Sequence, residues 1–154
     1  MTRAGVVWGL VALVTAASFG LAREPDAPVG LWRTEEGKAV VEIYRCEELL
    51  CGRIVWLKEP VKDGAPVTDR ENPVDSLRSR PVMGLVIMEG FAPDGEQEWS
   101  GGSIYDPESG DTYSAKMMLL EDQRLELRGY VLIPLFGRSE IWSRLEALPM
   151  LPPE

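Results

Sequence analysis

The amino-acid sequence predicts an all-β protein, an eight-stranded antiparallel up-and-down barrel with one long loop between its third and fourth strands. Eight short segments rich in β-branched and aromatic residues alternate with turns that contain Gly, Pro, Asn or Asp. Beyond the N-terminal region, no segment shows convincing amphipathic helical periodicity. Most of the strands are joined by short turns, which favours adjacent hairpins, and eight strands can close into a barrel with no exposed edge. A two-sheet sandwich is the alternative that the same pattern allows.

The N-terminal segment of the 154-residue chain is typical of a secretory signal. Arg3 is the one charged residue among the first 22, and an apolar run covers residues 6–17. Small residues at Gly20 and Ala22 fit a cleavage site, so we expect the mature protein to begin at Arg23. This gives a signal peptide at 1–22, a barrel domain at 23–148 and a Pro-rich tail at 149–154. An uncleaved N-terminal anchor is the alternative, and after cleavage no integral membrane span is expected.

Net charge and composition exclude several classes of function. The chain carries a net charge of −9, which argues against nucleic acid and anionic membrane surfaces as partners. It contains no histidine, which excludes Ser-His-Asp and Cys-His catalysis and any metal site built on imidazole. We therefore expect a protein that is not an enzyme, with no catalytic residue, no bound metal and no cofactor.

The first two strands of the mature chain, predicted at 30–34 and 39–45, flank the turn at 35–38. This turn places Trp32 opposite Val41 and Gly30 opposite Ile43 on one apolar face.

The cysteines, Cys46 and Cys51, lie between the strand at 39–45 and a third strand at 52–57. If the two cysteines lie opposite each other across a four-residue turn, one register sorts the apolar and polar side chains onto separate faces. An exported chain meets an oxidising compartment, so a disulfide is expected to clamp this hairpin. The same register predicts two apolar pairs, Ile43 with Ile54 and Val41 with Trp56.

Residues 59–81 form the predicted long loop, because four prolines and nine charged residues interrupt the strand pattern there. Two explanations fit its polar residues: they have a functional role, or they only form turns. These polar residues are Asp69, Asn72, Arg78 and Arg80.

The remaining strands are predicted at 82–88, 99–105, 112–120, 124–132 and 138–145. The turn at 121–123 places Met117 opposite Leu127 and Leu119 opposite Leu125. Between the strands at 99–105 and 112–120, residues 106–111 carry three carboxylates, but they lack EF-hand spacing. Pro107 and Gly110 indicate a hairpin turn there instead.

Several motifs along the mature chain resemble the DUF2147 family of exported bacterial proteins. They are, in order, Gly30-Leu-Trp32, the Cys46–Cys51 hairpin with Gly52-Arg-Ile-Val-Trp56, Asn72-Pro, Gly101-Gly-Ser-Ile-Tyr-Asp-Pro-Glu-Ser-Gly-Asp-Thr-Tyr113, Gly129-Tyr, Pro134-Leu-Phe-Gly137 and Trp142-Ser-Arg144. The Gly-x-Trp opening and the closing Arg are also similar to lipocalin and calycin barrels. The resemblance implies that Trp32 and Arg144 close the base of the barrel through a cation–π contact. It also implies a periplasmic or secreted bacterial protein.

The aromatic and methionine residues suggest a function in binding. We expect a module for a small, partly apolar ligand, lined by residues of the barrel interior. An eight-stranded barrel is just wide enough to hold one small ligand or to be filled by side chains. The alternative is therefore an envelope scaffold or protein-interaction module with a filled barrel, acting through its long loop and its tail. The candidate lining residues are Trp56, Tyr105, Tyr113, Met117 and Tyr130.

Overall fold

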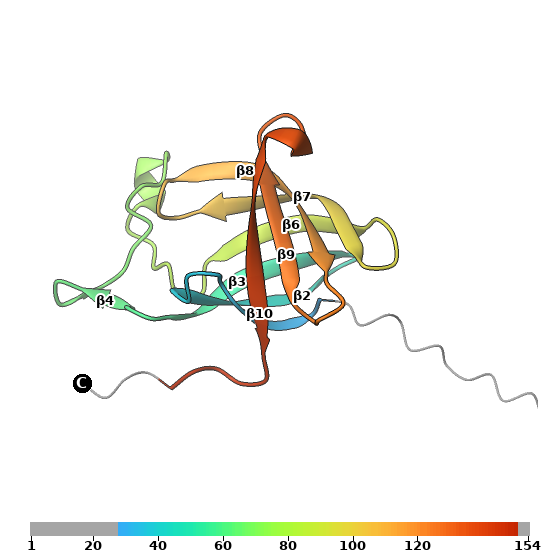
Figure 1. Ribbon diagram of the computed structural model, residues 1–154. Coiled ribbons are helices and arrows are strands. Elements are labelled where there is room, and N and C mark those ends of the chain that lie inside the picture. Colours follow the sequence, from blue (N-terminus) through green and yellow to red (C-terminus); the bar gives the residue numbers. More distant parts are fainter. Residues whose placement is uncertain (1–27, 151–154) are drawn as a thin grey trace, which may run out of the picture.

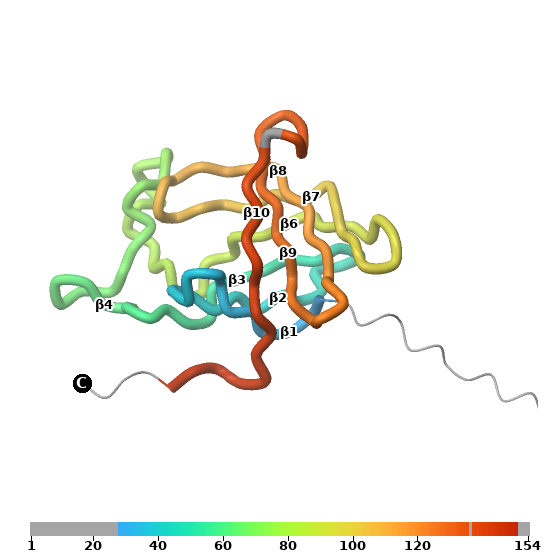
Figure 2. Tube along the Cα trace, viewed as in Figure 1, coloured from blue at the N-terminus to red at the C-terminus, as the bar shows by residue number. Residues whose placement is uncertain are grey.

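The computed structural model describes residues 28–150, which form a closed antiparallel barrel (Figure 1). The predicted signal peptide at 1–22 and the last four residues of the predicted tail lie outside the described residues. Eight strands close the barrel in the order β1-β10-β9-β8-β7-β6-β3-β2, which confirms the predicted fold class (Figure 2). The barrel strands are β1 (Gly30–Arg33), β2 (Ala39–Cys46), β3 (Leu49–Leu57), β6 (Val86–Pro93), β7 (Glu98–Asp106), β8 (Asp111–Leu119), β9 (Leu125–Tyr130) and β10 (Gly137–Leu145).

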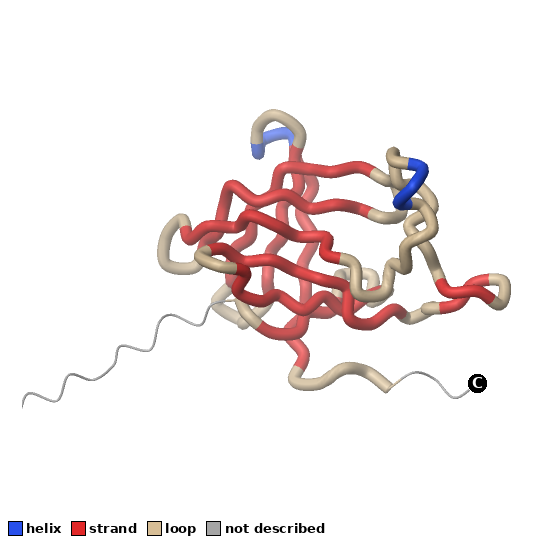
Figure 3. Tube along the Cα trace, turned by 180° about the vertical axis from the view of Figure 1, so that it is seen from behind, coloured by secondary structure: helices blue, strands red, loops and turns tan. Residues whose placement is uncertain are grey.

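The long connection between β3 and β6, residues 58–85, carries its own short elements. Strands β4 (Val61–Lys62) and β5 (Ala65–Pro66) form a small hairpin, and the 3-10 turn η1 (Asp75–Leu77) follows. Seen from behind, this loop gathers at one side of the barrel strands (Figure 3). A second 3-10 turn, η2 (Pro134–Phe136), lies between β9 and β10. No helix in the described part of the chain has the length and apolarity that a membrane span requires.

The up-and-down order gives the barrel two different ends. The β1–β2, β3–β6, β7–β8 and β9–β10 connections share one end, which we call the loop end. At the opposite end, the terminal end, the described chain enters at Pro28 and leaves after Leu145. Figure 1 shows η2 at the top of β10 and the C-terminal tail at its foot.

The barrel interior is filled with large apolar side chains. A Cβ added at Gly52 would lie 2.8 Å from the Met88 sulfur, and one at Gly102 would lie 2.5 Å from the Phe91 ring. Neither position has room for a methyl group, so glycine is required where these strands face the core. The buried core cluster consists of Trp32, Val41, Ile43, Leu50, Ile54, Val82, Ile87, Met88, Phe91, Trp99, Ala115, Met117, Leu119, Leu125, Leu127 and Trp142.

The terminal end is closed by Trp32 and Arg144, which lie opposite each other on β1 and β10. The Arg144 guanidinium lies 4.4 Å from the centre of the Trp32 ring, a distance typical of a cation–π contact. Trp32 Nε1 donates to the Pro28 carbonyl at 2.7 Å, and Arg144 Nη1 donates to the Val29 carbonyl at 3.0 Å. The contact that the resemblance implied is therefore present, and both side chains also hold the segment that precedes β1.

Cys46 and Cys51 form a disulfide with a Cα–Cα distance of 5.8 Å, but the register that predicted it is wrong by two residues. Cys46 pairs with Leu49 and Cys51 pairs with Tyr44, so the bond joins the strands diagonally. The turn has two residues rather than four, and Glu47 adopts the positive φ of 57° that such tight turns require. A shift of two leaves every side chain on its original face, so the apolar pattern could not distinguish the two registers.

The predicted strand at 82–88 is also corrected, because β6 begins at Val86 and continues to Pro93. Gly84 turns the chain with a φ of 85° before the strand starts. Val82 is buried in the core cluster although it belongs to the loop. Gly84 and Leu85 still exchange backbone hydrogen bonds with Ile54 of β3, at 2.8 and 2.9 Å, so the chain already runs along the sheet before β6 begins.

Candidate functional site

A cleft of about 600 Å³ lies between the long loop and the outside of the barrel. Its outward position follows from strand alternation, because side chains along a strand point to opposite faces. Met88 pairs with Ile104, and this pair packs in the core. The next pair along the strands, Glu89 with Ser103, therefore faces outward, and both residues line the cleft. The cleft thus opens on the outer surface, although Ile87 of its wall also belongs to the core cluster, against which Leu85 and Tyr105 pack.

A buried polar cluster fixes the long loop to the barrel beside this cleft. Tyr105 in β7 donates from its hydroxyl to Asp69 Oδ1 at 2.5 Å. Asn72 Nδ2 donates to Asp69 Oδ2 at 2.8 Å and to the Tyr105 hydroxyl at 3.1 Å. Arg80 donates from Nε to Asp69 Oδ2 at 2.8 Å, and its Nη2 lies 2.8 Å from the same oxygen. The loop residues Asp69, Asn72 and Arg80 are thereby tied to one side chain of the barrel wall.

Asp69 is ionised in this cluster. Its burial by itself would raise the pKa, but hydrogen bonds from Tyr105, Asn72 and Arg80 stabilise the carboxylate and lower the pKa below its usual value. Burial raises the pKa of Tyr105, and its hydrogen bond to Asp69 raises it further, so this hydroxyl remains a donor. Both Asp69 oxygens accept hydrogen bonds, so the cluster acts as a rigid support.

The wall of the cleft combines apolar and polar side chains. Met83, Leu85 and Ile87 contribute apolar surface from the end of the loop and the start of β6. Arg80 and Tyr105 contribute the edge of the buried cluster, so one side of the cleft is polar. Such a combination suits a small molecule with an apolar body and a polar group. The other lining residues are Asn72, Pro73, Pro81, Gly84, Val86, Glu89, Ser103 and Thr112.

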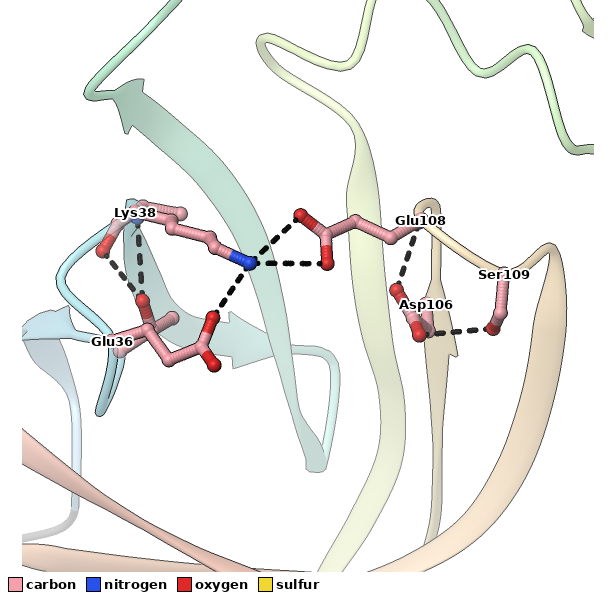
Figure 4. A network of polar contacts seen from close by, with 7 residues as sticks. Glu36, Lys38, Asp106, Glu108 and Ser109 are labelled. Atoms are coloured by element: carbon pink, nitrogen blue, oxygen red, sulfur yellow. Dashed lines mark hydrogen bonds and ion pairs between the residues drawn. The ribbon is translucent and has the colours of Figure 1, made fainter.

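Turns at the loop end are joined by exposed ion pairs (Figure 4). Lys38 in the β1–β2 turn contacts Glu108 in the β7–β8 turn at 3.3 Å and Glu36 at 2.6 Å. These turns belong to strands that are not neighbours in the barrel, so the Lys38–Glu108 contact spans its loop end. The hydrogen bonds that Lys38 donates to Glu36 and Glu108 raise the pKa of Lys38. Solvent exposure screens these pairs, which therefore contribute little to stability.

The β7–β8 connection is a hydrogen-bonded turn, as the sequence predicted. Asp106 Oδ1 accepts from the Glu108 backbone amide at 2.8 Å, and Asp106 Oδ2 accepts from the Ser109 hydroxyl at 2.9 Å. Gly110 packs so closely against the backbone of Glu71 that a Cβ there would collide with it. The turn thus supports the long loop that covers the cleft.

The chain is similar to one family of bacterial proteins and to one solved barrel structure. The sequence model of DUF2147, described as an uncharacterized protein conserved in bacteria, matches residues 30–144. The chain belongs to the DUF2147 family. A solved structure of a protein from Helicobacter pylori, described as belonging to the lipocalin family, has a similar fold, with a TM-score of 0.69 and 22% sequence identity. The match covers 78% of this chain and 84% of that one. No curated protein matches the sequence.

In this DUF2147 chain, the five candidate lining residues do not surround one cavity. Tyr105 lines the cleft. Met117 is buried in the core cluster, and Tyr113 lies on the same inward face of β8. Tyr130 lies on the outward face of β9, one residue beyond the inward-facing Gly129.

Trp56 departs from the prediction because of a β-bulge in the first hairpin. The two-residue shift alone would place Trp56 opposite Ala39, on the predicted face, but the register also shifts between Val40 and Val41, so Trp56 lies opposite Val40. Neither Trp56 nor Val40 belongs to the core cluster, whereas Leu57 packs against it. One extra residue in a strand moves the following side chains to the other face, and the sequence pattern does not reveal it.

The link between Asp69 and Tyr105 was missed by sequence reasoning. The loop residues were singled out as polar candidates, but nothing in the sequence identified their partner 36 positions further along the chain. The available signal was the run of hydrogen-bonding residues from Asp69 to Arg80, which marks the loop as a candidate but does not identify Tyr105.

Proposed function

We propose that this DUF2147 protein binds a small, partly apolar ligand in the cleft between the long loop and the outer face of β6 and β7. The observation that carries the proposal is a preformed cleft of about 600 Å³ with one apolar wall and one rigid polar wall. Ligand sites are commonly concave, mostly apolar and equipped with a few fixed polar groups. The lipocalin-like fold supports a binding role of this kind.

The charges around the cleft narrow the chemistry of the ligand. The positive charge of Arg80 is already compensated by Asp69. Glu89 has no ion-pair partner among the described residues, so it contributes an uncompensated negative charge to the cleft. A hydroxyl or amino group on the ligand is favoured here over a carboxylate or phosphate, because like charges repel. The apolar part of the ligand would lie over Met83, Leu85 and Ile87.

We assign no catalytic step to the cleft and place the protein outside the bacterial cytoplasm, in the periplasm or secreted. Hydrogen bonds already engage Asp69, and the Tyr105 proton is directed at that carboxylate, which leaves neither group as a free base or nucleophile. The Cys46–Cys51 disulfide is compatible with an oxidising compartment.

A second candidate is an envelope scaffold with a filled barrel. The absence of space for a methyl group at Gly52 or Gly102 favours it, because a ligand cannot enter the interior at these levels. It differs from the first candidate in requiring no occupant of the cleft.

Native mass spectrometry of protein purified from cells that export it tests the proposal. We expect the wild type to carry a small organic molecule that Ser103→Trp loses, because an indole on the outward face of β7 fills the cleft. Ser143→Trp adds the same group to an exposed site on β10 and should retain the molecule. A bare wild-type chain, or a molecule retained by Ser103→Trp, would overturn the proposal and favour the scaffold.

A further inference from the structure

The β9–β10 loop exposes an unusual concentration of apolar side chains at the loop end of the barrel. The exposed fractions are 59% for Val131, 91% for Leu132, 48% for Ile133 and 76% for Leu135. The loop projects beyond the strands, at the top of β10 (Figure 1). It forms a convex tip and not part of the wall of the cleft. Contiguous exposed apolar surface of this kind marks an interaction site.

The tip is held in position by the barrel. Arg128 donates from Nε to the Pro134 carbonyl at 2.7 Å and from Nη1 to the Ser139 hydroxyl at 3.0 Å. Leu132 has a φ of 70°, in the left-handed region that is costly for a branched residue without compensating contacts. The fold thus keeps Leu132 in a strained conformation that directs its side chain into solvent. Burial within this chain does not compensate for that strain.

The local charge differs from that of the whole chain. Residues 127–139 contain Arg128 and Arg138 and no acidic residue, although the chain carries a net charge of −9. Lys116 pairs with Arg128 across β8 and β9, but Glu98 lies 3.9 Å from its ammonium, so this pair adds no net charge. The other acidic neighbours are Glu126 on β9 and Glu140 on β10, whose carboxylate accepts from Trp142 Nε1 at 2.9 Å. In salt, exposed charges interact only over about 10 Å, so the two arginines determine the electrostatic potential at the tip.

We propose that the β9–β10 loop inserts its apolar tip into the surface of a lipid bilayer, with Arg128 and Arg138 at the level of the headgroups. A convex tip of four exposed apolar side chains needs no complementary groove in a bilayer. A stable protein partner would instead require about 800 Å² on each side, contributed by roughly 20–30 residues. The overall acidity that argues against anionic membranes acts on the remaining surface. It therefore orients the protein with this end toward the bilayer.

Tryptophan fluorescence with bromine-labelled phospholipids tests this inference at the position concerned. The exported protein carrying Leu132→Trp is mixed with vesicles of equal parts phosphatidylcholine and phosphatidylglycerol, with bromine on the acyl chains. The matched control is Met150→Trp, because Met150 is 92% exposed and lies in the tail at the terminal end. We expect the added fluorescence of Leu132→Trp to be quenched and that of Met150→Trp to be unaffected. The two variants share the same N-terminal segment, so the difference in quenching between them still reports on the tip if that segment also binds the vesicle.

A second variant measures the contribution of the tip. Leu132→Asp combined with Leu135→Asp should lower vesicle binding at least about tenfold, because two inserted leucines supply more than the corresponding free energy. Met150→Asp should leave binding unchanged. Equal quenching at both tryptophans, or no quenching at Leu132→Trp, would overturn the inference. The inference would also be wrong if the double variant converted an oligomer to a monomer without changing vesicle binding. The tip would then join copies of the chain.

Discussion

Gly102→Ala is expected to destabilise the protein because the barrel interior has no space for the added methyl group. Its Cβ would lie 2.5 Å from Phe91 Cδ2 and 2.6 Å from two further atoms of the same ring. Carbon atoms in good contact are about 3.5–4.0 Å apart, so the ring would have to retreat by roughly 1 Å. Phe91 is completely buried within the core cluster and cannot move without displacing its neighbours. We therefore expect a loss of about 2–3 kcal/mol, the upper part of the range for overpacked cores.

Urea denaturation measures this loss, and a second substitution shows whether the clash causes it. Phe91→Leu removes ring atoms, so Gly102→Ala should cost no more than about 1 kcal/mol in that background. The midpoint should fall in the single variant without a change in slope. A Gly102→Ala variant as stable as the wild type would refute the reasoning. It would show that the interior has free space and would return it to consideration as a ligand cavity.

Three further predictions concern the contacts that hold the loop, the terminal end and the first hairpin. Because the pKa of Asp69 is lowered, its contribution to stability is present above the ordinary carboxyl pKa and is lost as pH falls through the folded-state pKa. Asp69→Asn should therefore lower the free energy of unfolding by about 2–4 kcal/mol at neutral pH. Denaturation at several pH values should show that the variant loses less stability than the wild type as the solution is made acidic. Trp32→Ala should lower the free energy of unfolding by ~3–5 kcal/mol and Arg144→Ala by ~1–2 kcal/mol. The two losses should be coupled in a double-mutant cycle, and Arg144→Lys should restore only part of the stability. Losses that simply add would mean that the contact contributes nothing. Reduction of the Cys46–Cys51 bond should lower the free energy of unfolding by about 2 kcal/mol, and alkylation of both thiols in native exported protein would contradict the disulfide.

Local pairing was predictable where short turns fix the register. The β1–β2 turn correctly placed Trp32 opposite Val41, and the β8–β9 turn correctly placed Met117 opposite Leu127. In each case the turn length and the apolar alternation agree on one register, because a slip of one residue would expose the core face.

The first hairpin shows the limit of this reasoning. A two-residue shift and a bulge between Val40 and Val41 both satisfy the apolar pattern, so the sequence predicted the Cys46–Cys51 disulfide from an incorrect register. The bulge then removed Trp56 from the interior face to which it had been assigned.

The candidate site was only partly predictable because it is built from residues distant in sequence. Asp69 and Arg80 were recognisable as polar residues of a long loop. Their partner Tyr105 and the cleft beside them depend on how that loop folds back against β6 and β7. No periodicity encodes such packing of an irregular segment, and strand alternation alone suggested an interior site.

Methyl NMR of the methionines tests most directly whether the cleft, and not the barrel interior, binds ligand. Met83 lines the cleft, whereas Met88 and Met117 are buried in the core. N-Phenyl-1-naphthylamine, an uncharged small molecule with a large apolar body and an amino group, is titrated into protein with labelled methionine methyl groups. We expect progressive, saturable shifts of the Met83 methyl signal, with the Met88 and Met117 signals unchanged. Shifts of Met88 and Met117 without a shift of Met83 would contradict it.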